Sequence, residues 1–319
     1  ILLVLPLSLR GWLGLHRRQP RRFTRARAAV FAAGALILVL AVCSPIDVLG
    51  SMLLQAHMAQ HILVMMAAPP LLLWAWPALP VLCGLPRRLR REWIGPFLAS
   101  PAVRRATAFA THPITCFAGY TIILWTWHHP GLYELALRSE AWHRVEHLSF
   151  FLAGVLLWWP VIQPYPFRAA WPRWAAVPYL VVATVENTIF SALFAFSDRV
   201  FYPAYEQAPR LGWWSALDDQ AAAGAMMWVP GSLIMLVPIV WLLHELTRST
   251  RLRAVGPVKG LALAGVGGFE LEGGSPSPAT SMRTGQPENH SRTPVIARSA
   301  GVYVSNGGAL ALPVLPATG

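Results

Sequence analysis

Six of the ten histidines in this 319-residue sequence gather in three short segments, and their spacing suits metal binding. In chain order they are His57, His61, His128, His129, His143 and His147. The first two are four residues apart, as are the last two, so each pair places two imidazoles on one face of a helix. Imidazole is the commonest protein ligand for metals and suits copper, zinc and iron. A single histidine at a helix end is commonly just a tolerated polar group, but two matched pairs favour a metal or haem site.

Methionines near two apolar segments narrow the choice of metal. Met65 follows His61 by four residues, and Met226 follows Asp219 by seven. Thioether sulfur is a soft ligand that selects Cu(I). Methionine also fills gaps between packed helices, so ligation and packing both remain open for Met65 and Met226.

The composition indicates which elements position these side chains. Hydrophobic residues make up 55% of the sequence, charged residues only 13%, and the mean hydropathy is +0.47. A soluble domain carries roughly 25% charge, so a soluble globule, a disordered chain and a coiled coil are all excluded. A helix needs about 20 apolar residues to cross a bilayer. Six windows meet this length, namely residues 28–49, 52–79, 106–128, 143–162, 174–197 and 219–243, and residues 1–9 resemble the tail of another helix. We predict an all-α, polytopic transmembrane helix bundle in the lipid bilayer, with six complete spans and a truncated first span.

The arginines predict how the bundle is oriented. The formal net charge is +12, but the basic residues lie in short loops between apolar windows, which indicates membrane orientation rather than nucleic-acid binding. The Arg-rich segments are residues 10–27, 87–105, 168–173 and 248–253. They alternate with residues 44–51 and 130–142, where acidic residues outnumber basic ones, and with the mixed segment 198–217. Because cytoplasmic loops retain positive charge, the Arg-rich segments are expected inside. All three histidine segments then lie at the outer level of the membrane, although their spacing does not show whether they meet.

This pattern divides the chain into three parts. Residues 1–27 form the truncated span and an Arg-rich cytoplasmic loop, and residues 28–246 form the transmembrane domain. From residue 247 onward we expect a cytoplasmic tail, and its Gly, Ser, Pro and Thr content beyond residue 256 predicts disorder.

The motifs also resemble those of a known family. Residues 57–61 read HMAQH and precede Met65, Met66 and a Pro-Pro pair, residues 127–130 read WHHP, and residues 143–147 read HRVEH. Later segments read WWPV at 158–161, FSDRVFYPAY at 196–205, DQ at 219–220 and MWVPG at 227–231. In this order and spacing, residues 9–246 resemble the polytopic CtaG family of cytochrome c oxidase assembly factors.

The resemblance implies a multi-pass protein of the bacterial plasma membrane that helps copper reach the catalytic subunit of a haem-copper oxidase. Its partners would be copper and the cytochrome c oxidase subunits, and no enzymatic turnover is implied. The family's motif positions correspond here to His57, His61, His128, His143 and His147, with Asp219 expected to orient an imidazole. His129 departs from the family pattern, which places its role in doubt.

Two other functions remain open on the residues alone. Histidines at matched depth on facing helices would also suit the axial ligands of haem in a membrane redox protein. A copper importer would need a polar path through the bilayer, for which the adjacent Glu186 and Asn187 offer a start. The sequence contains no nucleotide-binding or hydrolase motif.

Overall fold

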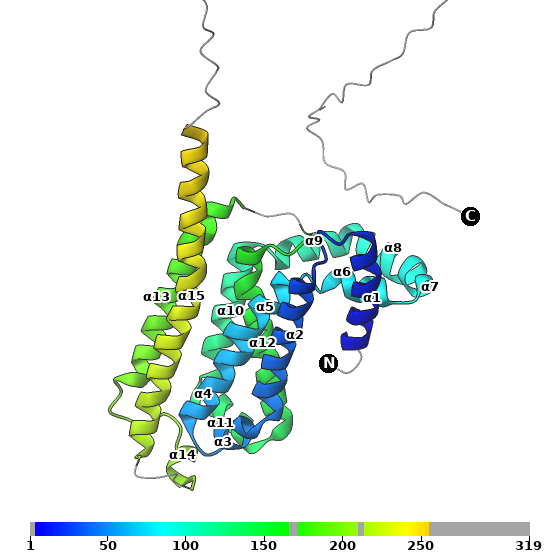
Figure 1. Ribbon diagram of the computed structural model, residues 1–319. Coiled ribbons are helices and arrows are strands. Elements are labelled where there is room, and N and C mark those ends of the chain that lie inside the picture. Colours follow the sequence, from blue (N-terminus) through cyan, green and yellow to red (C-terminus); the bar gives the residue numbers. More distant parts are fainter. Residues whose placement is uncertain (1–3, 166, 168–170, 210–213, 255–319) are drawn as a thin grey trace, which may run out of the picture. The chain divides into compact units, whose positions relative to one another are not determined.

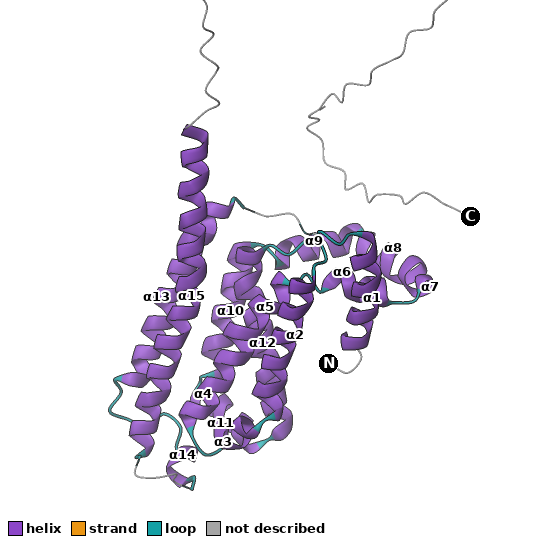
Figure 2. Cartoon of the chain, in the orientation of Figure 1, coloured by secondary structure: helices purple, strands orange, loops and turns teal. Residues whose placement is uncertain are grey.

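The computed structural model describes residues 4–165, 167, 171–209 and 214–254, which lie in the first of two units, residues 1–259. Within these residues every regular element is a helix (Figure 2). The predicted all-α class is confirmed.

The helices follow one another with short connections (Figure 1). In chain order they are α1 (Val4–Arg18), α2 (Arg25–Cys43), α3 (Pro45–Gly50), α4 (Leu54–Ile62), the π-helical η1 (Leu63–Ala67), α5 (Ala68–Trp74), α6 (Ala78–Gly84), α7 (Arg87–Leu89), the π-helical η2 (Arg90–Ile94), α8 (Gly95–Ala99), α9 (Pro101–Ala110), α10 (Pro113–Trp127), α11 (Pro130–Arg138), α12 (Glu140–Ile162), the 3-10 helix η3 (Arg173–Ala175), α13 (Ala176–Ala195), α14 (Ala204–Gln207) and α15 (Ala216–Ala254).

Among the described residues, five helical segments are long and apolar enough to cross a membrane, rather than the six predicted. They are Arg25–Cys43, Leu54–Trp74, Glu140–Ile162, Arg173–Ala195 and Ala216–Arg248. The window at residues 106–128 is divided between α9 and the 15-residue α10. Pro113 causes this division, because it lacks an N–H and forces the preceding His112 into an extended conformation with ψ 135°.

Prolines explain two other boundaries that differ from the prediction. The window at residues 28–49 divides between α2 and α3 because Ser44, the residue before Pro45, is extended with ψ 173°. The window at residues 52–79 stops at Trp74, and the chain turns at Trp76, which precedes Pro77 and has φ 58°. Both differences are local chain breaks within the predicted windows.

The two ends of the helical domain also differ from the prediction. Helix α1 does not stop at residue 9 but continues through Arg10 to Arg18 and packs against α6. Helix α15 continues to Ala254, past residue 247, where the tail was expected to begin. The predicted disorder concerns residues that lie outside those that the structure describes.

The continuous segment formed by α4, η1 and α5 is the centre of the bundle. It is the most buried of the five candidate spans and contacts α2, α12 and α15. Helix α12 approaches it closely at Gly154, where a Cβ would collide with the carbonyl oxygen of Met65 and lie 2.7 Å from the ring of Pro69. This approach holds α12 against η1 and α5, the continuation of α4, so that the predicted ligands of α4 and of α12 face one another.

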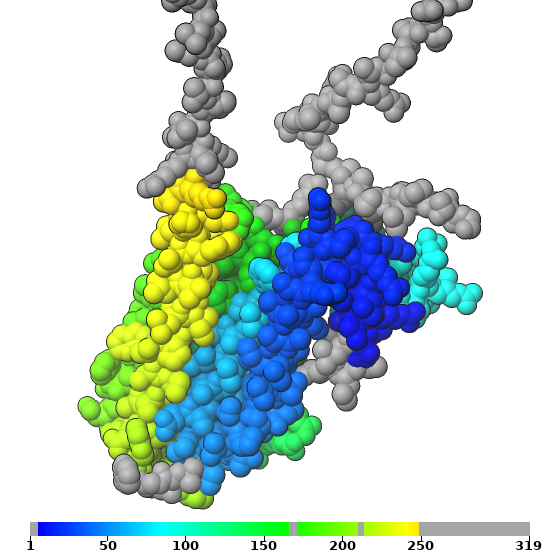
Figure 3. Space-filling view, in the orientation of Figure 1, coloured from blue at the N-terminus to red at the C-terminus, as the bar shows by residue number. Residues whose placement is uncertain are grey.

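The outer surface of the bundle is apolar. Exposed aliphatic side chains follow α13 and α15, among them Val182, Ile189, Leu233 and Val237. In Figure 3 the surface of α15, in yellow, lies beside the blue surface that includes α4, in agreement with their packing. Such a surface suits acyl chains rather than water, as expected for a membrane protein.

The histidine-bearing helix ends lie at one end of the bundle. Figure 1 places the start of α4, the end of α10 and the start of α12 near α3, α11 and α14, opposite the α1–α2 connection and α7 to α9. The Arg-rich connections and the histidines of the three predicted segments are therefore on opposite sides, as the charge pattern predicted. Which side faces the cytoplasm stays a prediction.

Candidate metal centre

The five histidines of the family pattern meet inside the bundle. His57 and His61 lie on α4, His143 and His147 lie on the first turns of α12, and His128 caps the C-terminus of α10. Neighbouring ring centroids are between 4.2 Å (His143 to His147) and 6.2 Å (His61 to His128) apart. Four of the rings are buried, and His143 is half-buried. We call these five histidines, together with Glu146 of α12, the histidine cluster.

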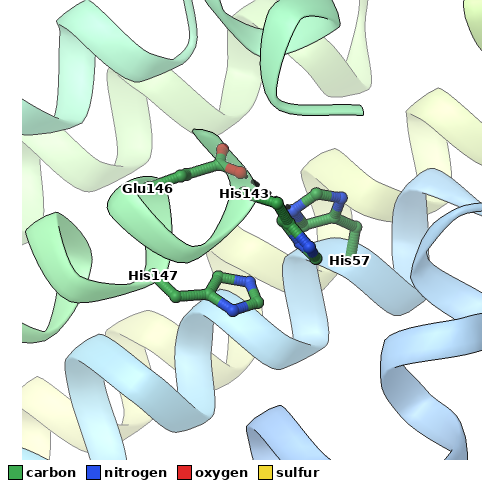
Figure 4. A group of neighbouring side chains, drawn as sticks. All are labelled: His57, His143, Glu146 and His147. Carbon is green, nitrogen blue, oxygen red and sulfur yellow. Dashed lines mark ion pairs between the residues drawn. The ribbon is translucent and has the colours of Figure 1, made fainter. Parts of the chain in front are cut away.

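Four side chains of the cluster converge closely enough to hold one ion. His57, His143, Glu146 and His147 each offer a donor atom, and these atoms all lie within 4.8 Å of one another. Figure 4 shows His57 of α4 facing the three residues of α12. Metal–nitrogen and metal–oxygen bonds are about 2.0–2.2 Å long, so donors on one ion are at most about 4.4 Å apart, and a small shift of these side chains would bring them onto one cation.

Glu146 is the member of this group that the sequence interpretation left out. Its side chain is fully buried, with Oε2 3.6 Å from His57 Nε2 and Oε1 3.7 Å from His61 Nε2. Its position between His143 and His147 and its charge within a span were signals for a functional role. A buried carboxylate surrounded by imidazoles supplies the negative charge that a cation needs.

Many polar atoms of the cluster are buried and have no hydrogen-bond partner among the described residues. They are Nε2 of His57, His61, His128, His143 and His147, Nδ1 of His61, and both carboxylate oxygens of Glu146. Buried polar atoms in folded proteins are nearly always hydrogen-bonded, because an unpaired one costs about 1–3 kcal/mol. A cation bound between these atoms would compensate that cost, so the cluster has the properties of a binding site.

The hydrogen bonds of Tyr205 determine which ring nitrogen of His57 has a lone pair free to bind a metal ion. The Tyr205 hydroxyl donates to the carbonyl oxygen of Gly50 at 2.8 Å, which leaves it to accept from Nδ1 of His57 at 3.2 Å. Burial raises the pKa of Tyr205, so the phenol keeps its proton. His57 therefore carries its proton on Nδ1, and its Nε2 lone pair points towards Glu146.

His128 is oriented in a similar way. Its Nδ1 donates to the carbonyl oxygen of Leu124 at 2.8 Å, which leaves Nε2 with a free lone pair. Its own carbonyl oxygen accepts a hydrogen bond from Tyr202 at 2.9 Å. Groups that fix the tautomer of a histidine in this way are typical supports of a metal ligand.

Tyr205→Phe is expected to weaken copper binding by about 10-fold, because Nδ1 of His57 then loses its acceptor and the ring its fixed tautomer. The affinity for Cu(I) is measured by competition with a colorimetric chelator. Tyr179→Phe is the matched control, since Tyr179 is a buried tyrosine that donates to the carbonyl oxygen of Leu157 outside the cluster. Equal affinities in the two variants would contradict an orienting role for Tyr205.

The structure gives Asp219 a different role from the one predicted. Its Oδ2 accepts from the backbone N–H of Leu54 at 2.6 Å, and its Oδ1 accepts from that of Gln55 at 3.2 Å. Asp219 contributes these bonds from α15 to the first turn of α4, whose own N-cap, Leu53, has no side-chain hydrogen bond. It therefore positions the helix that carries His57 rather than an imidazole directly.

The predicted thioether ligands lie among apolar side chains. Met65 is buried in the core within η1, and Met226 is half-buried and packs against the same core. Their ligation of copper stays a prediction. His129 is exposed and lies outside the group of converging donors, in line with its departure from the family pattern.

The polar pair on α13 is held by neighbouring helices. Glu186 accepts hydrogen bonds from Thr121 and from the indole of Trp125, both on α10. Asn187 donates to the carbonyl oxygen of Met227 on α15. These contacts account for both side chains through packing between neighbouring helices.

The chain matches a known protein family over most of its length. Residues 7–249 match the family described as cytochrome c oxidase caa3 assembly factor (Caa3_CtaG). An uncharacterized protein of Mycobacterium leprae is 24% identical over 246 residues, which is 75% of this chain and 37% of the relative. An uncharacterized protein of Mycobacterium bovis is 26% identical over 258 residues, which is 78% of this chain and 38% of the relative.

The chain thus spans well under half the length of these curated relatives, and no solved structure matches it. Since the family match covers most of the sequence and includes all five clustered histidines, the chain belongs to the caa3-type cytochrome c oxidase assembly factors of the CtaG family.

Proposed function

We propose that this assembly factor binds copper at the histidine cluster and assists formation of a copper centre in cytochrome c oxidase. The observation that carries the proposal is the convergence of His57, His143, Glu146 and His147, whose donor atoms lie within 4.8 Å of one another. The unpaired, buried lone pairs of these side chains support a cation as the occupant.

The identity of the metal rests on chemistry and on the family. Imidazole suits copper, zinc and iron alike, and the role of the family in building an oxidase favours copper among them. Haem is less suited, because its two axial ligands lie on opposite faces of a wide macrocycle. Here four donors converge on a point within a packed bundle, which suits a single ion better.

The placement in the membrane supports delivery from the outer side. Since cytoplasmic loops retain positive charge, the Arg-rich end of the bundle and the C-terminus belong in the cytoplasm and the histidine cluster faces the extracytoplasmic side of the bacterial plasma membrane. The protein acts there as a non-catalytic metal carrier embedded in lipid, with the oxidase subunits as its partners.

Metal analysis of the detergent-purified full chain, loaded with Cu(I) under reducing conditions, tests this function. Wild type is expected to retain at least one copper per chain, and His57→Ala/His147→Ala to lose at least one. His129→Ala/His244→Ala is the matched control, because both of its histidines are exposed, and it should retain wild-type copper. The same three proteins are then tested for restoring active oxidase in a strain that lacks this factor. Copper-free wild type, or a double variant with unchanged copper, would refute the proposal.

A further inference from the structure

We propose that the histidine cluster holds two copper ions bridged by the carboxylate of Glu146. This inference rests on the proposed copper function and specifies how many ions are held and by which residues. The first ion lies among His57, His143 and His147, and the second lies between His61 and His128.

The first reason for a second ion is that the histidine cluster contains more possible metal ligands than one ion would use. The group whose ligand atoms lie within 4.8 Å of one another contains three histidines and Glu146 and leaves out His61 and His128. Both omitted histidines are nevertheless buried, with an unpaired Nε2 among the described residues. One ion among the first four residues would leave these two imidazoles unexplained.

The second reason for two ions is the position of the Glu146 carboxylate between two sets of histidines. Its two oxygens face different histidines, Oε2 towards His57 Nε2 at 3.6 Å and Oε1 towards His61 Nε2 at 3.7 Å. Neither oxygen has a hydrogen-bond donor among the described residues. A carboxylate with two free oxygens directed at separate ligand sets is suited to bridge two metal ions, which in such centres are about 3.5–4 Å apart.

The second subsite is suited to an ion of low coordination number. The rings of His61 and His128 stand edge to face, with centroids 6.2 Å apart and an interplanar angle of 79°. Because Nδ1 of His128 is hydrogen-bonded to the carbonyl oxygen of Leu124, only its Nε2 is free to bind a metal. The subsite thus offers two imidazoles, and Oε1 of Glu146 lies 3.7 Å from Nε2 of His61 only.

The surroundings of this subsite favour a monovalent ion. Phe150 packs against both rings, with centroids 4.2 Å from His61 and 5.6 Å from His128, and Phe190 lies 4.7 Å from His128. Charge is costly to bury among such side chains unless it is compensated. Two Cu(I) ions beside one carboxylate leave less uncompensated charge than two divalent ions, so the centre is expected to hold Cu(I).

The copper stoichiometry of the full chain in detergent tests this proposal. Under anaerobic Cu(I) titration with a competing chelator, wild type is expected to bind two ions. His61→Gln/His128→Gln and His143→Gln/His147→Gln should each bind one, and the exposed control His129→Gln should bind two. X-ray absorption of the wild-type protein should show copper–copper scattering at about 3.5–4 Å, a readout that needs no variant.

The outcomes separate this inference from the proposed function. One copper per wild-type chain, without copper–copper scattering, would overturn the bridged pair and leave the copper function standing. No copper in wild type would refute both. Two ions in wild type and in His61→Gln/His128→Gln alike would also overturn the assignment of the second ion to these residues.

Discussion

Glu146→Gln is expected to weaken copper binding by at least about 100-fold, since even groups that only support a metal ligand change affinity by 10–100-fold. The substitution keeps the size of the side chain and removes its charge. In wild type the carboxylate lies fully buried between His57 and His61 and has no hydrogen-bond donor among the described residues. With a neutral amide at this position, the bound cations lose the one acidic side chain in the group of converging donors. Chelator competition with Cu(I) measures the change, and oxidase activity in the host strain is expected to fall with it.

Glu140→Gln provides the matched control for this experiment. Glu140 lies on the same helix, is exposed and pairs with Arg144 on the surface. Removing its charge tests whether any nearby carboxylate suffices, and its copper affinity should equal that of wild type. Wild-type affinity in Glu146→Gln would show that the carboxylate is not a ligand, and an equal loss in both variants would indicate a general electrostatic effect.

Asp219→Ala is expected to destabilise the folded protein by about 2–4 kcal/mol, the combined cost of a lost helix cap and of buried unpaired amides. In wild type both oxygens of Asp219 accept from the first backbone N–H groups of α4, those of Leu54 and Gln55. The negative charge also interacts favourably with the positive end of the α4 dipole. The loss is measured as a lower midpoint of thermal unfolding in detergent, and copper affinity should fall as the start of α4 frays around His57.

Two further substitutions make the test of Asp219 specific. Asp219→Asn keeps one acceptor oxygen and should lie between wild type and Asp219→Ala. Asp218→Ala changes an exposed neighbour whose carboxylate accepts hydrogen bonds from the backbone N–H and the hydroxyl of Ser215 at the start of α15, and it should lower the midpoint less than Asp219→Ala does. If Asp218→Ala and Asp219→Ala lower the midpoint equally, the capping role of Asp219 is wrong.

The apolar windows predicted the helices well but not where they break. Pro113 lies inside a window whose hydropathy predicted one span, and the structure divides that window into α9 and α10. Hydropathy averages over many residues, whereas a helix breaks at a single residue that lacks an N–H. The π-helical turn η1, which lies between His61 and the Pro69-Pro70 pair, is likewise decided by local hydrogen bonding rather than by average composition.

The pairing of the clustered histidines was predictable because their spacing follows helix geometry. A separation of four residues places His57 with His61, and His143 with His147, on single faces, and the alternating arginine loops placed both pairs at one end of the bundle. These properties depend on neighbours along the chain, and the sequence by itself therefore determined them.

The roles of the acidic residues were decided only by tertiary structure. Asp219 was expected near an imidazole and instead caps α4, while Glu146, which was not among the predicted ligands, lies between two histidines of another helix. Tyr205 reaches His57 from a position 148 residues away in the chain. A carboxylate or a phenol acts on whatever group packs opposite it, and that group depends on which helices are neighbours and how they are rotated about their axes. Spacing along one helix carries no information about either, so these three roles follow from the packing of the bundle alone.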